Sequence, residues 1–284
     1  MKGVLYVLLA EFFFAASSVA GKFALAEGDI PGIELTFFRF LLGTVIGFTV
    51  MLRSKESFVP RNPSMVALRA VFNAISAMCF YQALKYTTVT NTNMLGMTYP
   101  LWVVLFAPLV IREKFEWKNL LYMGLALLGV YLVVHPNFGS INRGDIYAFF
   151  SGVTASVAVL ALRQARRYDS TPLIIFYLMA TALVINAFLL LPAWVDPTAR
   201  QWVFILVSGL LGVLAQLSIT QGYKYIEATR GSLVSSSRIL MAGAMGVIFF
   251  SDKLSVQILA GAVLILGSQY GLIRDKLRNA TALK

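Results

Sequence analysis

The feature that most constrains this chain is the recurrence of apolar stretches along its whole length. Each is close to the roughly 20 residues that a helix needs to cross a bilayer. Of the 284 residues, 58% are hydrophobic and only 13% are charged, whereas soluble domains carry about a quarter charged residues. The pattern therefore predicts an all-α, polytopic membrane protein.

We expect ten transmembrane helices joined by short connections, which leave no room for a soluble domain. The predicted spans are 4–26, 33–52, 65–85, 93–111, 119–134, 145–162, 172–194, 201–222, 231–250 and 256–273. The first stretch resembles a signal peptide, but Glu11 interrupts its apolar core and Lys22 lies just before the small-residue site. We therefore expect a retained first span.

Lysine and arginine are distributed unevenly among the connections. With the N-terminus placed inside, 16 of the 24 basic residues fall on the inner side and four on the outer side. Basic loops favour the cytoplasmic side, so the bias predicts a multi-pass protein of the bacterial inner membrane with both termini in the cytoplasm. It also explains the net charge of +11 as topology. The expected partners are the lipid bilayer and a small metabolite, not nucleic acid.

Two halves of the sequence resemble each other. The segment "ALKYTTVTNTNMLG" at 83–96 aligns with "GYKYIEATRGSLVS" at 222–235. At the same offset of 139 residues, "REKF" at 112–115 aligns with "SDKL" at 251–254. The common order and offset of these matches indicate a duplication.

Because each half holds five spans, the second copy must enter the membrane in the opposite orientation. Inverted repeats of this kind are typical of secondary transporters, whose substrate sites lie near the bilayer midplane at the repeat interface. We predict a first five-helix repeat at 1–135, an inverted second repeat at 145–273, and a cytoplasmic tail at 274–284.

A family resemblance is clearest at residues 83–133. A short loop leads into a span that contains Pro100, Glu113 ends this span, and Gly124 and Gly129 lie in the next one. This pattern resembles the EamA-type transporters of the drug/metabolite transporter superfamily, and the resemblance covers essentially the whole chain. It implies a transporter fold that works without a cofactor.

The second copy keeps only part of this pattern. It has Asp252, Gly261 and Gly267, but Ile239 stands where the proline would fall. The superfamily moves amino acids, amines, nucleotide-sugars and vitamins, so the resemblance leaves the substrate open. The single cysteine, Cys79, excludes internal disulfides and cysteine-based metal sites; we expect no metal.

Two charged residues lie well inside predicted spans. Glu11 is seven residues into the first span, about 10 Å deep at 1.5 Å per residue, and Arg238 lies at a similar depth in the ninth. Intramembrane charges are costly and mark functional sites by default. We predict that both face a central cavity, where they either bind substrate or form a structural bridge. Glu11 is also the predicted coupling residue for protons, with substrate exchange as the alternative.

Other polar residues at similar depth complete the predicted substrate site. They are Arg39, Asn73, Tyr81, Asn93, Tyr99, Gln216 and Ser235. Some of these side chains would instead form packing hydrogen bonds between helices. Arg69 and Lys22 lie nearer the span ends, so we expect both to reach the membrane surface.

The predicted activity is secondary-active transport of amino acids or related zwitterionic or amine metabolites, with efflux favoured. Uptake of a larger metabolite, such as S-adenosylmethionine or riboflavin, is the alternative. An intramembrane enzyme is disfavoured, because the only histidine, His135, lies at an outer span end and no phosphate-binding loop is present. Gly267 and Gly271 form a GxxxG pattern, which serves either a homodimer or packing within the chain.

Overall fold

The computed structural model describes residues 2–54, 56–111, 118–134, 142–225, 234–235, 237–253 and 255–282. Within these ranges the chain is helical and contains no strand, which confirms the predicted all-α class. The helices are α1 (Lys2–Ala26), α2 (Gly32–Ser54), α3 (Pro63–Tyr86), α4 (Val89–Gly96), α5 (Tyr99–Ile111), α6 (Lys118–Val134), α7 (Arg143–Ala165), α8 (Thr171–Leu190), α9 (Ala199–Gly222), α11 (Ser237–Phe250) and α12 (Val256–Ala282), with a 3-10 turn η1 (Leu191–Ala193) after α8.

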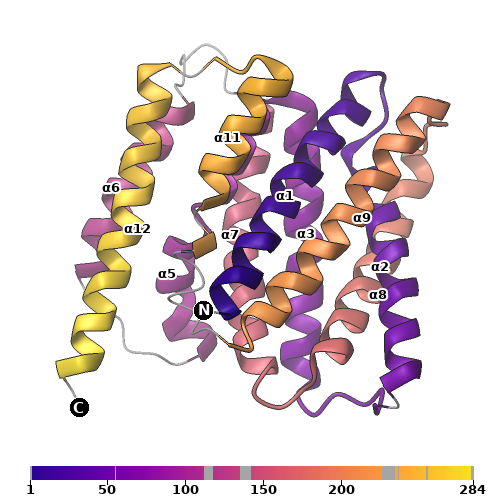
Figure 1. The fold of residues 1–284 in the computed structure, drawn as a ribbon, viewed down its shortest axis with the longest axis horizontal. Helices are drawn as coiled ribbons and strands as arrows, with labels where there is room; N and C mark the ends of the chain where they lie inside the picture. The colour runs from indigo at the N-terminus through magenta and orange to yellow at the C-terminus, as the bar shows by residue number, and fades with distance from the viewer. Residues whose placement is uncertain are drawn as a thin grey trace.

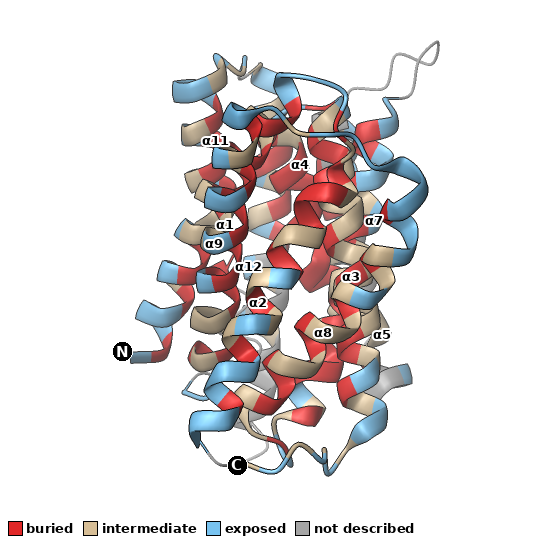
Figure 2. Cartoon of the chain, turned by 90° about the vertical axis from the view of Figure 1, so that its right-hand side faces the viewer, coloured by how far each residue is buried: buried red, intermediate tan, exposed pale blue. Residues whose placement is uncertain are grey.

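The outer surface of the bundle is apolar. Six helices of the described chain are long and apolar enough to cross a bilayer, namely α1, α2, α3, α7, α8 continued by η1, and α9. Large side chains such as Phe188 and Ile248 are more than two-thirds exposed, whereas buried residues gather between the helices (Figure 2). Water does not favour so much exposed apolar surface. The protein is therefore a multi-pass membrane protein.

The helix starts have local causes. The side chains of Thr88, Asn142, Ser170 and Thr198 each accept a hydrogen bond from a backbone N–H in the first turn of α4, α7, α8 and α9. These are preferred N-cap residues. Pro63 begins α3, where its missing N–H leaves no helical hydrogen bond unmade.

The predicted span at 93–111 is divided in the structure into α4 and α5. Pro100 follows the break, and a proline has no N–H to donate to the carbonyl four residues earlier, at Gly96. Helix α7 approaches closely here, because a Cβ placed on Gly152 would lie 3.0 Å from the carbonyl oxygens of Leu95 and Gly96. A glycine on α7 thus makes room for the interrupted span.

Helices α6 and α12 also approach closely. A Cβ on Gly129 would lie 2.8 Å from the carbonyl oxygen of Gly261. Gly271 of the predicted GxxxG pattern faces the ring of Tyr122 within the same chain, whereas a Cβ on Gly267 would meet nothing within 4 Å. The last helix continues to Ala282, past the predicted span end at residue 273.

The helices pair across the two predicted halves. Helix α1 packs along α9, α3 along α7, α2 along α8, and α6 along α12. Figure 1 shows α6 and α12 at one edge of the bundle, α2 and α8 at the other, and the remaining pairs between them. The interior between these pairs is where the charged side chains meet.

Candidate functional site

A cavity of about 120 Å³ lies in the middle of the bundle. Its walls come from α1, α2, α3, α5, α7, α9 and α11, together with the break between α4 and α5. Its polar lining residues are Ser17, Arg39, Arg69, Asn73, Ser76, Tyr81, Tyr99, Ser151, Gln216, Tyr223 and Arg238. Five of the predicted site residues other than Arg238 are in this set. The structure thus brings most of the predicted site to one cavity.

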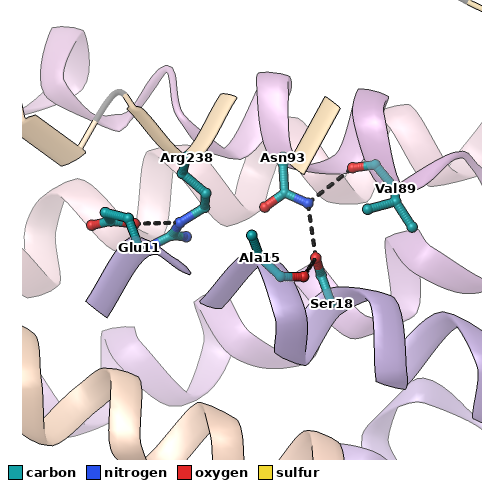
Figure 3. A network of polar contacts seen from close by, with 6 residues as sticks. All are labelled: Glu11, Ala15, Ser18, Val89, Asn93 and Arg238. Carbon is teal, nitrogen blue, oxygen red and sulfur yellow. Dashed lines mark hydrogen bonds and ion pairs between the residues drawn. The ribbon is translucent and has the colours of Figure 1, made fainter. Parts of the chain in front are cut away.

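Glu11 and Arg238 form a direct ion pair. The Nε of Arg238 lies 2.5 Å from Oε2 of Glu11, and the Glu11 side chain is fully buried. Figure 3 shows the two side chains facing each other from α1 and α11. The Arg238 guanidinium also lies 4.2 Å from the ring centroid of Phe14, one turn along α1. Arg238 lines the cavity, whereas Glu11 lies behind it and holds the guanidinium.

Arg39 approaches the same aromatic ring. Its guanidinium carbon lies 5.4 Å from the Phe14 centroid, so both arginines contact one ring by cation–π interaction. The Arg39 side chain lies against Gly212 of α9, where a Cβ would be 2.7 Å from its Nε. Among the described residues no carboxylate pairs with Arg39. The side chain is nonetheless buried, with a residual exposure of 6%.

Arg69 departs from the sequence-based expectation. It does not extend to the membrane surface but is buried, with 4% exposure, and lines the cavity near Tyr99 and Tyr223. Its helix presents Asn73 and Ser76 on the same side, at the i+4 and i+7 positions. That spacing was the signal in the sequence that Arg69 belongs to the site.

Lys22 also differs from the expectation, although less so. Its Nζ donates hydrogen bonds to the carbonyl oxygens of Leu84 and Thr87, at 2.6 and 2.8 Å. These carbonyls lie at the C-terminal end of α3, where a helix favours a cation. The side chain therefore joins α1 to α3 and does not line the cavity.

Tyr81 closes one end of the cavity. Its hydroxyl lies 2.7 Å from Ser17 Oγ and 3.1 Å from Ser208 Oγ, and Ser17 also donates to the Ser208 carbonyl at 2.8 Å. This cluster joins α1, α3 and α9. The two serines were missed in the sequence, because small polar residues in spans commonly serve packing alone.

The remaining predicted residues fall into two groups. Asn73, Tyr99 and Gln216 line the cavity. Asn93 and Ser235 are buried outside it.

Asn93 and Ser235 have different surroundings. The Asn93 amide donates to Ser18 Oγ and to the Val89 carbonyl oxygen, at 3.1 and 2.9 Å, as Figure 3 shows. Ser235 lies beside Glu11 and Tyr99. The predictions about Glu113 and His135 concern positions outside the described residues.

Comparison with known proteins assigns the class of this fold and site. The model of the EamA-like transporter family matches residues 1–135 and again 142–274. The chain therefore belongs to the EamA-like transporter family.

Similar proteins carry transporter names. The chain is 27% identical over 276 residues to a pseudopaline exporter of Pseudomonas aeruginosa, with 96% of each chain covered. It is 24% identical to human solute carrier family 35 member G1, covering 95% of this chain and 78% of that one. It is 22% identical to a riboflavin transporter of Brucella anthropi, covering 92% and 95%. The names of these three relatives are those of transport proteins.

A solved crystal structure shares the fold. It superposes with a TM-score of 0.65, at 19% sequence identity, and the match covers 98% of both chains. At this identity the likeness bears on the fold alone.

Proposed function

We propose that this protein is a secondary-active transporter that moves a small metabolite by alternating access at the central cavity. The observation that carries the proposal is the cavity itself, which places buried guanidinium groups beside an intramembrane carboxylate. Such groups are expensive in a bilayer and persist where they handle a substrate or an ion. Membership of a transporter family supports the same conclusion.

The helix pairing supports two inverted five-helix repeats. If the spans of the second half repeat those of the first, α1 corresponds to α7 and α3 to α9. The packing of α1 on α9 is then matched by that of α7 on α3, and the contact of α2 with α9 by that of α8 with α3. When the two repeats are interchanged, α2 takes the place of α8 and α6 takes the place of α12, so the contacts within these two pairs are preserved. A two-fold relation in the membrane plane accounts for all of these contacts, and the family model matches twice.

The cavity reaches toward the side where α1 begins and α12 ends. Arg69, Leu162 and Tyr223 line it and lie near the helix ends on that side. On the opposite side, contacts such as Tyr81 with Ser17 and Arg200 with Glu27 join the helices. The basic connections favour a cytoplasmic location for both termini. We infer that the cavity, which lies nearer this inner side, is loaded from it, as efflux from a bacterial inner membrane requires.

The pair of Glu11 and Arg238 suits a zwitterion such as an amino acid. Arg238 offers a guanidinium fork to a carboxylate, and Oε1 of Glu11 is buried without a hydrogen-bond partner in the described chain. That oxygen lies behind Arg238, so a substrate ammonium group reaches it only when the substrate's carboxylate draws the Arg238 guanidinium away from Glu11. A larger metabolite is the alternative, and the relative named as a riboflavin transporter favours it. A homodimer stays a prediction, since Gly271 already packs within the chain.

Reconstituted proteoliposomes test the proposal. Vesicles loaded with amino acids should exchange them for a radiolabelled amino-acid mixture outside. Arg238→Lys should fold and insert normally but exchange more slowly, because lysine cannot form the bidentate contact. The matched control is Arg53→Lys at the exposed end of α2, which should behave as wild type. No exchange above empty vesicles, with either amino acids or riboflavin, would contradict the proposal.

A further inference from the structure

We propose that Arg39 and Arg69 form a second anion-binding subsite, so that the substrate carries carboxylate groups beyond the one at Arg238 and has a net negative charge. This inference rests on the proposed transport function and specifies its substrate class. Three guanidinium groups line the cavity, and within the described chain one carboxylate, that of Glu11, pairs with one of them. Arginine stays protonated in such surroundings. The cavity therefore carries two positive charges that no described side chain neutralises.

Neither arginine has a carboxylate partner in the described chain, although the Arg39 guanidinium also contacts the Tyr81 hydroxyl. Each is more than nine-tenths buried. The Nε of Arg39 and the Nε of Arg69 have no hydrogen-bond partner within the described chain. A buried charge without a partner strongly destabilises a fold in general. Their persistence inside the bundle points to a partner that arrives from outside the chain.

The surroundings hold these groups in place without neutralising them. Gly212 leaves space for the Arg39 side chain, and Phe14 supports its guanidinium from one face. Arg69 lies beside the phenolic rings of Tyr99 and Tyr223. Arg39 and Arg69 also lie near enough to repel each other electrostatically. A rigid pair of like charges favours an anion that bridges both.

Charge complementarity then sets the substrate class. A zwitterion satisfies Arg238 and Glu11 but leaves Arg39 and Arg69 unmatched. A molecule with one more carboxylate, such as an acidic amino acid or a dicarboxylate, places that carboxylate between these two arginines. Hydrogen bonds between two charged groups are the stronger ones, so we expect acids to bind more tightly than neutral molecules of the same shape.

The test uses matched acid and amide pairs on the purified full-length protein. L-glutamate is compared with L-glutamine, and succinate with its monoamide succinamate, by the ligand-induced rise in melting temperature. Each acid should bind at least about tenfold more tightly than its amide, because one charge-assisted hydrogen bond has about that value. Arg39→Gln and Arg69→Gln should each remove this preference. Arg53→Gln, at an exposed position, should keep it.

Thermal stability separates binding from a structural role. If the two arginines serve the substrate, removing an unpaired buried charge should leave the ligand-free melting temperature unchanged or raised. Equal binding of acid and amide by the wild type would overturn the inference, as would a preference that survives in both variants. Exchange of glutamine as fast as glutamate in proteoliposomes would overturn it while leaving the transport function intact. Absence of all exchange would contradict the transport function itself.

Discussion

Gly212 and Arg39 are complementary in shape across the interface of α9 and α2. A Cβ at position 212 would lie 2.7 Å from the Arg39 Nε and 2.8 Å from its Cδ. Because the two helices come from different halves of the chain, the fit couples the packing of the halves to the position of a charge in the cavity. The glycine thus fixes the position of the Arg39 guanidinium in the cavity wall.

Substitution of this glycine should therefore affect transport more than folding. In Gly212→Ala the added methyl group displaces the flexible Arg39 side chain, so exchange in proteoliposomes should fall severalfold while the yield of folded protein changes little. Gly243→Ala on α11 is the matched control, because its Cβ would meet nothing within 4 Å. Equal exchange by both variants would show that Arg39 is not needed at its observed position.

The ion pair between Glu11 and Arg238 should govern stability. Arg238→Ala leaves the Glu11 carboxylate buried and unpaired, at a cost of about 3–5 kcal/mol. The variant should misfold or melt far below the wild type, measured on the purified protein. Adding Glu11→Gln in the same chain removes the stranded charge and should restore folding. If the double variant also regains transport, Arg238 does not bind the substrate.

If Glu11 carries the coupled proton, its substitution should affect transport driven by a pH gradient but not exchange of substrate for substrate. In Glu11→Gln the side chain cannot be deprotonated, so accumulation driven by a pH gradient should be lost. Exchange of substrate for substrate needs no net proton movement and should continue. The two activities are measured in the same vesicles with and without the gradient. Equal loss of both would make Glu11 a binding or structural residue.

The topology predicts which connections a membrane-impermeant thiol reagent reaches in intact cells. In a Cys79→Ser background, a cysteine at Asp196 should be labelled, since this exposed residue follows α8 on the predicted outer side. A cysteine at Ser57, equally exposed between α2 and α3, should be labelled only after the membrane is opened. Labelling of the cysteine at Ser57 in intact cells would contradict the predicted topology.

Much of this fold could be predicted from the sequence, because a bilayer limits the choice of elements. A span must satisfy its own backbone groups, so an apolar run of sufficient length becomes a helix. The predicted span at 145–162 matches the centre of α7, and Glu11 meets Arg238 as their equal depths required. The division of the fourth span into α4 and α5 was indicated in the sequence only by Pro100.

The features that could not be predicted depend on how each helix is rotated about its axis and on which helices pack beside it. Hydropathy contains no information on either. Depth along a span follows from residue number, but the direction of a side chain follows from its neighbours. Asn93 has the right depth and yet points to Ser18. Arg69 lies near a span end, where a long side chain can reach the surface, but its helix faces the cavity. Contacts such as Gly152 against Leu95 join positions far apart in the sequence, and no local pattern predicts them.

Site-directed blocking tests most directly whether substrate passes through the cavity between the two halves. Ala155 lines the cavity from α7, whereas the neighbouring Thr154 does not. In a Cys79→Ser background, a thiol reagent should stop amino-acid exchange in proteoliposomes of Ala155→Cys and leave Thr154→Cys active. Excess unlabelled glutamate should protect Ala155→Cys from the reagent. Full exchange after complete modification of Ala155→Cys would contradict the account.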